Sequence, residues 1–151
     1  MESGVIRKPL LFVRMAFHLI TVIWIMKNFI GKKCIEAFAR EFWCYGVQVT
    51  NCCCMFLNFE NTKLIKILHS DESHSWEFEE VDEIVDRNSG LGDSEFFYPY
   101  SSVRIVDGTG LTLEEYVEDQ EGNWFLNFSS GVQLKFMYDN YKEEARYEVC
   151  I

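Results

Sequence analysis

The hydrophobic and polar positions of residues 124–138 alternate along two short segments, WFLNF and VQLKFMY, which the tripeptide Ser129-Ser130-Gly131 joins. Large apolar side chains fall at every second position, namely Trp124, Leu126, Phe128, Val132, Leu134, Phe136 and Tyr138. Side chains on a strand alternate between two faces, so this period predicts two half-buried strands. Gly131 suits a tight turn because it tolerates a positive φ. The stretch therefore predicts a β-hairpin packed on a core.

The same period predicts further strands on either side of this hairpin. Residues 47–68 form a second predicted hairpin, in which a nearly continuous apolar run is followed by a polar turn at residues 60–63. Shorter alternating segments predict strands over 76–78, 103–106, 111–117 and 145–151. Two of these assignments have helical alternatives. We favour a strand over residues 34–43, and residues 111–117 also fit a helical turn.

Two segments break the alternation. Residues 79–95 are rich in acids, glycine and asparagine, which predicts a solvated loop, with a short helix over 81–86 left open. Its acids lack the spacing of a calcium-binding loop. The next segment, FFYPY at residues 96–100, contains a proline and so belongs at a sheet edge or in a loop. Its aromatic side chains either seal the sheet or present a surface to a partner.

The N-terminal segment is the most ambiguous part of the chain. Residues 10–26 are mostly apolar and approach the length of a membrane span, but Arg14 and His18 lie inside this run. A signal anchor, a signal peptide and an amphipathic core helix all remain open. So does an extension upstream of Met26, where MKNFIGKKC resembles the start of a domain. We favour the extension or a peripheral helix, and divide the chain into a hydrophobic segment at residues 1–25 and one β-rich domain at residues 26–151.

These elements predict an α+β fold that is mainly an antiparallel β meander of six to eight strands, with an N-terminal helix packed on or beside it. The length of 151 residues suits one domain with a real core. Sixteen per cent of the residues are aromatic, which favours strands and interaction surfaces over a helical bundle.

The net charge of −10 is distributed unevenly. Nine basic and four acidic residues precede Ile67, whereas five basic and twenty acidic residues follow from there on. Nucleic acid is disfavoured as a direct partner because phosphates are met by Lys and Arg. The acidic half has two readings, a solvated face or a docking face for a basic protein.

The sequence contains no recognised catalytic or metal-binding motif, and we expect no cofactor. The cysteines Cys52, Cys53 and Cys54 are consecutive, so on a strand they cannot all converge on one metal ion. The six cysteines form no CxxC pair, which favours a reduced, intracellular compartment, while a disulfide between Cys150 and a sheet cysteine remains open. His69 and His74 flank a polar turn at a spacing that zinc sites do not use.

Three stretches resemble small bacterial immunity proteins that neutralise polymorphic or contact-dependent toxins. They are KNFIGKKCIEAF, CCCMFLNFENTKLIKIL and NWFLNFSSGVQLKFMYD, which are similar to an "IGKKI" opening, an "LxFENGxxIKI" strand pair and a late "LxFxNGxxLxF" hairpin. The resemblance covers residues 26–151. It implies a single-domain, non-enzymatic, cytoplasmic inhibitor that plugs its toxin with an acidic face. The hydrophobic N-terminus departs from this pattern and leaves inner-membrane association through residues 10–26 open.

We therefore expect a binding protein that blocks a basic toxin, such as a nuclease, by electrostatic steering followed by occlusion. The alternative is a small β-barrel-like protein with an apolar ligand among Trp76, Phe97 and Trp124. The predicted partner-binding residues are Asp71, Glu72, Glu79, Glu80, Asp82, Glu83, Asp86, Glu114, Glu118, Asp119, Phe97, Tyr98 and Tyr100.

Overall fold

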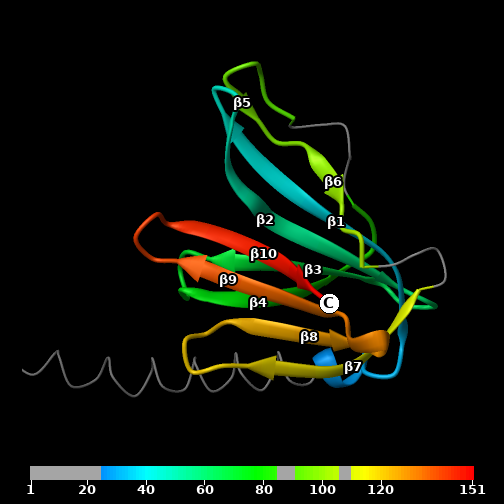
Figure 1. The fold of residues 1–151 in the computed structure, drawn as a ribbon. Coiled ribbons are helices and arrows are strands. Elements are labelled where there is room, and N and C mark those ends of the chain that lie inside the picture. The colour runs from blue at the N-terminus through cyan, green and yellow to red at the C-terminus, as the bar shows by residue number, and fades with distance from the viewer. Residues whose placement is uncertain (1–24, 85–90, 106–109) are drawn as a thin grey trace, which may run out of the picture.

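A computed structural model describes residues 25–84, 91–105 and 110–151, and strands dominate these residues (Figure 1). The strands are β1 (Lys33–Cys44), β2 (Val47–Phe59), β3 (Leu64–Ser70), β4 (Ser75–Val81), β5 (Phe96–Phe97), β6 (Tyr100–Ser102), β7 (Leu111–Glu118), β8 (Trp124–Phe128), β9 (Gln133–Asp139) and β10 (Glu144–Cys150). The order in the sheet is β10-β9-β8-β7-β1-β2-β3-β4, and β5 and β6 both pair with β1. Every pairing between these strands is antiparallel.

The strands form two meanders, β1–β4 and β7–β10, that join at one short contact. Strands β1 and β7 pair through Lys33 with Thr112 and Cys34 with Leu111. Gly110 precedes β7 with φ +81°, and a Cβ there would lie 2.6 Å from the Lys33 side chain. Glycine is therefore required for this close approach. Because the junction is so short, the second meander can fold over the face of the first.

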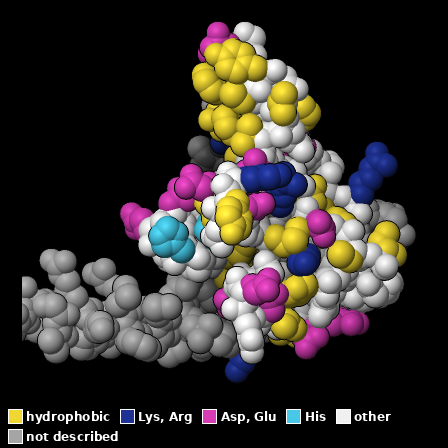
Figure 2. Space-filling model, turned by 60° about the vertical axis from the view of Figure 1, so that its left-hand side comes forward, with side chains coloured by type: hydrophobic (Ala, Val, Ile, Leu, Met, Phe, Trp, Pro, Cys, Tyr) yellow, Lys and Arg dark blue, Asp and Glu magenta, His cyan; other side chains and the backbone are white. Residues whose placement is uncertain are grey.

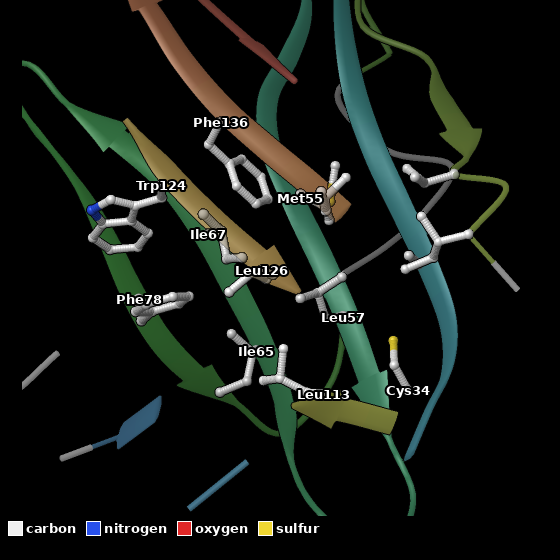
Figure 3. Close-up of a cluster of buried hydrophobic side chains, with 14 of the residues drawn as sticks. Cys34, Met55, Leu57, Ile65, Ile67, Phe78, Leu113, Trp124, Leu126 and Phe136 are labelled. Atoms are coloured by element: carbon white, nitrogen blue, oxygen red, sulfur yellow. The ribbon is translucent and has the colours of Figure 1, made fainter. Parts of the chain in front are cut away.

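The interior lies between these two layers (Figure 3). Trp124, Leu126 and Phe136 from the second meander point toward Ile67 and Phe78 of the first. The ring centroids of Phe78 and Trp124 are 4.3 Å apart. Burying such side chains stabilises the fold by about 1.5–3 kcal/mol each. The alternation in residues 124–138 is confirmed, since its apolar face packs in this core.

The side chain of Asn51 joins the outer strand of the second layer to the first. Its Nδ2 donates to the carbonyl oxygen of Tyr147 at 3.0 Å, and its Oδ1 accepts from the Tyr147 amide at 3.0 Å. Thr50 also donates its hydroxyl to the carbonyl of Ala145. One asparagine amide thus replaces the two backbone bonds of a strand partner and covers the edge of β10.

Asn51 occupies this position because β2 is irregular there. Arg40 pairs with Cys54, but Phe42 pairs with Thr50, so residues 51–53 oppose the single residue Glu41. Such a bulge bends the strand and increases its twist. Beyond it the β1–β2 hairpin projects past the two layers, with β5 along its edge (Figure 1).

The mainly antiparallel sheet is confirmed, but two features of the predicted fold differ. Residues 25–84, 91–105 and 110–151 form ten strands rather than six to eight, because β5 and β6 add two short edge segments to β1. The predicted N-terminal helix is not confirmed: helical residues 25–27 and a following turn are what the described part contains, and residues 1–24 lie outside it. Met26 and Phe29 in this segment are buried in the core.

The strand predicted over residues 103–106 is wrong in its described part. Val103 and Ile105 are buried, as an alternating strand would require, yet the Ile105 amide donates to the Val103 carbonyl at 2.9 Å. This three-residue turn ends the pairing with β1. Residues 82–84, where a short helix was left open, are not helical, and residues 85–90 and 106–109 lie outside the described ranges.

Candidate partner-binding surface

The projecting part of the molecule comprises residues 41–50 and 91–100, and we call it the arm. Strand β1 has an open edge beyond its contact with β7, and β6 and β5 fill this edge in turn. Pro99 lies between them without an amide to donate, but its carbonyl accepts from the Glu41 amide at 2.8 Å. The Tyr45 amide donates to the Glu95 carbonyl at 2.8 Å. The arm is therefore a continuously hydrogen-bonded three-stranded unit.

A row of stacked rings covers one face of the arm. Phe42 lies between two rings, with centroids 6.3 Å from Phe96 and 4.8 Å from Tyr98, and both pairs are stacked with planes 14° apart. Tyr45 at the hairpin end lies 6.0 Å from Phe96. Such ring pairs are favourable beyond the area they bury. They fix the side chains of a segment that no second layer covers.

The row continues toward the two layers through the side chain of Arg40. The Arg40 guanidinium lies 5.5 Å from the Tyr98 ring centroid and 5.2 Å from that of Tyr100. Tyr100 in turn lies 6.2 Å from Phe56, in a small cluster on the outer face of the first layer. We call this set the aromatic ladder: Tyr45, Phe96, Phe42, Tyr98, Arg40, Tyr100 and Phe56.

The outer end of the arm is exposed. Tyr45 is 68% exposed, Phe96 43% and Phe97 42%. Figure 2 shows hydrophobic side chains gathered on the part of the molecule that projects at the top. Monomeric proteins seldom expose contiguous apolar patches without a functional reason. The arm is the best candidate for a partner surface in the described chain.

The three aromatic residues predicted to contact a partner occupy different positions on this arm. Phe97 is exposed, whereas Tyr98 and Tyr100 are half-buried in the ladder and support it. Sequence reasoning missed Tyr45, because its neighbours fit a core strand equally well, and it placed Phe96 in the aromatic run at residues 96–100 without including it among the predicted contacts. The available signal was the cluster of aromatic residues immediately before the turn at Gly46.

The charges on the arm are all negative. Its two segments contain Glu41, Asp93 and Glu95 and no lysine or arginine. Glu41 accepts a hydrogen bond from the Trp43 indole at 2.7 Å, and Glu95 accepts one from the Tyr45 hydroxyl at 3.3 Å. The carboxylates therefore border the exposed rings, a combination that suits a cationic partner.

The predicted acidic residues of the first layer lie at both ends of β4 rather than on one face. Asp71 and Glu72 are in the β3–β4 turn, whereas Asp82 and Glu83 follow the other end. A strand rises about 3.3 Å per residue, so the seven residues of β4 separate these pairs by roughly 20 Å. Glu79 and Glu80 are exposed near the second pair, and Asp86 lies outside the described residues.

The predicted acids of the second layer have mixed roles. Glu114 and Glu118 are exposed on β7. Asp119 organises the β7–β8 turn: its Oδ1 accepts from the Glu121 and Asn123 amides at 2.9 Å. The hydrogen bonds from Asn123 hold the pKa of Asp119 below its usual value. Asp119 thus has a structural role in this turn.

His69 stands apart from these acids on the rim of the core. Its ring stacks on Tyr138, with centroids 3.8 Å apart, and meets the edge of Trp76 at 5.4 Å. Burial lowers its pKa, and nearby Asp71 opposes this shift. The arrangement joins β3 and β9 across the two layers, so we assign His69 a packing role.

Two of the thiols, Cys34 and Cys53, are unsuited to nucleophilic chemistry. Burial raises the pKa of Cys34 to about 12 and that of Cys53 to about 11, so both are protonated at neutral pH. Within the described ranges, no group of three His, Cys, Asp or Glu side chains is placed to hold a metal ion.

The alternative of an internal apolar ligand gains no support from the interior. Trp76 and Trp124, which were expected to line a pocket, are each 1% exposed and pack on neighbouring rings. Phe97 instead lines an open pocket on the arm.

In the described part of the chain, no helix has the length and apolar character to cross a membrane.

Comparison of the chain with known protein families, curated proteins and solved structures gives no match. The assignment of a function therefore depends on the surface chemistry of this structure.

Proposed function

We propose that the chain is a non-enzymatic binding protein whose arm docks onto a basic partner protein, and that this partner is a toxin which the chain neutralises. One observation carries the proposal: Tyr45, Phe96 and Phe97 are exposed on a projecting, hydrogen-bonded unit whose charges are all acidic. Aromatic side chains dominate the energetics of protein interfaces, and rigid ones lose little entropy on binding.

The net charge of −10 supports a basic partner. Steering depends on the summed field of the protein, so the acids at both ends of β4 and along β7 contribute without sharing a face. Complementary charge mainly raises the association rate and is screened by salt. The exposed rings then provide the short-range contacts that slow dissociation.

The toxin is the finer part of the proposal and follows from the resemblance to immunity proteins. An inhibitor must occlude the active site of its toxin, and a projecting arm with fixed side chains has a shape that can enter a cleft. A nuclease presents a basic cleft to its phosphate substrate, which an acid-bordered arm would complement.

The proposal predicts a reading frame for a basic toxin next to the chain's own gene, and co-expression with that toxin tests it. The unmodified chain is expected to restore growth. The triple variant Tyr45→Ser/Phe96→Ser/Phe97→Ser should fold but fail to protect, because only exposed rings are removed. Tyr141→Ser is the matched control, since Tyr141 is a fully exposed aromatic residue far from the arm in sequence.

Two results would contradict the proposal. Full protection by the triple variant would remove the arm from the interface. An association rate that does not change between low and high salt would remove the steering role of the acids.

A further inference from the structure

The hairpin end of the arm contains an open pocket on the face opposite the aromatic ladder. It has a volume of about 530 Å³, and its lining is Trp43, Gly46, Gly92, Asp93, Ser94, Glu95 and Phe97. Trp43 and Phe97 are direct cross-strand partners, so their side chains project from the same face. Trp43 is half-buried and Phe97 is 42% exposed, so both rings are in part open to solvent.

The acidic wall of this pocket is held in place by its own loop. Asp93 Oδ1 accepts from the Glu95 amide at 2.8 Å and from the Phe96 amide at 2.9 Å. Gly92 has φ +86°, and a Cβ there would lie 1.9 Å from the Phe96 carbonyl oxygen, so only glycine fits. The hydrogen bonds from Phe96 and Glu95 also lower the pKa of Asp93, so this carboxylate stays ionised at neutral pH. The loop is preorganised before any partner arrives.

We propose that this pocket receives an arginine side chain of the partner protein. Two aromatic residues and two carboxylates in one open pocket match the chemistry of a guanidinium, which is planar, stacks on aromatic faces and pairs with carboxylates. Lysine is a more strongly hydrated point charge and stacks less well. The pocket and the arm carry no basic residue that would compete.

This inference rests on the proposed function for its biological meaning, but its chemistry can be tested without the partner. The probe is the peptide acetyl-Gly-Arg-Gly-amide, titrated into the full chain while the indole N–H resonance of Trp43 is followed by NMR. The resonance is assigned with Trp43→Phe. Binding is expected on the order of millimolar, because an exposed cation–π contact is weak.

Two matched peptides and two matched variants give the controls. The citrulline peptide has the same shape without the charge and should not shift the resonance, and the lysine peptide should bind less tightly than the arginine peptide. Asp93→Asn/Glu95→Gln keeps the oxygen acceptors of the loop and should weaken arginine binding about fivefold or more. Glu143→Gln/Glu148→Gln makes the same change in net charge at two exposed positions in and next to β10 and should leave binding unchanged.

Three results would each overturn the inference. The citrulline peptide could shift the Trp43 resonance as much as the arginine peptide does, or the lysine peptide could bind as tightly or more tightly. The third is that Asp93→Asn/Glu95→Gln leaves the affinity for the arginine peptide unchanged. Failure of the inference is distinguishable from failure of the proposed function. If the arginine peptide does not bind but the triple arm variant loses protection, the pocket assignment fails and the docking arm stands. If the peptide binds but the triple variant still protects, the docking role fails and the pocket stands.

Discussion

Aromatic side chains occupy two contrasting regions of this molecule, the space between the layers and the arm. Between the layers, Trp124 and Phe136 are almost completely removed from solvent. On the arm, Phe96 and Phe97 remain more than two-fifths exposed although they belong to equally regular strand pairing. The difference is the presence of a covering layer. The same alternation of apolar and polar residues therefore stabilises the fold where a second layer covers it and leaves aromatic side chains exposed where none does.

Removal of a covered ring should have the largest effect on stability. Phe136 is fully buried, with its ring centroid 5.2 Å from that of Trp76. Phe136→Ala should lower the free energy of unfolding by about 3–5 kcal/mol, because it leaves a cavity between the layers. Urea unfolding followed by tryptophan fluorescence measures this loss. A loss below about 1 kcal/mol would contradict the packing of one layer on the other.

Loss of the Asn51 hydrogen bonds, which join the two layers, should have the second-largest effect on stability. Asn51→Ala removes both hydrogen bonds to the backbone of Tyr147 and should cost about 1–3 kcal/mol. The Tyr147 amide should also exchange with deuterium faster. Asn127→Ala is the control, since Asn127 bonds to the side chains of Glu115 and Gln133 rather than to backbone. Unchanged exchange at Tyr147 would show that Asn51 does not secure β10.

A smaller, pH-dependent effect is expected at His69. Its pKa is lowered below the ordinary value of 6.5 by burial, so the folded state binds this proton less readily than the unfolded state. The stability that depends on neutral His69 is therefore complete above about pH 6.5 and decreases as the pH falls below that value. His69→Phe keeps a ring against Tyr138 without the titrating group.

The measurement is the urea midpoint at pH 7.5 and pH 5.0. His69→Phe should lose less stability over this interval than the unmodified chain, and His74→Gln, at an exposed position, should behave like the unmodified chain. An identical decrease in all three proteins would exclude His69 as the source.

The local elements of the fold were predictable from the sequence, because a strand's period of two depends only on neighbouring residues. The hairpin at residues 124–138 and the one at residues 47–68 both have their predicted positions. The sheet-edge alternative for residues 96–100 is confirmed, but the pairing of β5 and β6 with β1 was not predicted, because that edge of β1 is distant in sequence.

The surface was less predictable than the strands. The aromatic run at residues 96–100 raised two alternatives, sealing or exposure, and the structure contains both: Tyr100 packs on Phe56, whereas Phe97 is exposed. The sequence of this run does not indicate whether a second layer of strands covers its side chains. The acidic pairs at residues 71–72 and 82–83 are close in sequence, but the extended strand β4 between them places the two pairs at its opposite ends.

The most direct test of the proposed docking role is the affinity of the proposed toxin partner, once purified, for the triple variant Tyr45→Ser/Phe96→Ser/Phe97→Ser, measured by calorimetry beside Tyr141→Ser. Exposed rings contribute little to folding, so the melting temperatures of both variants should stay close to that of the unmodified chain. We predict that the triple variant loses at least about a hundredfold in affinity, or roughly 2.7 kcal/mol, while Tyr141→Ser keeps it. Equal affinities for the two variants would contradict the account.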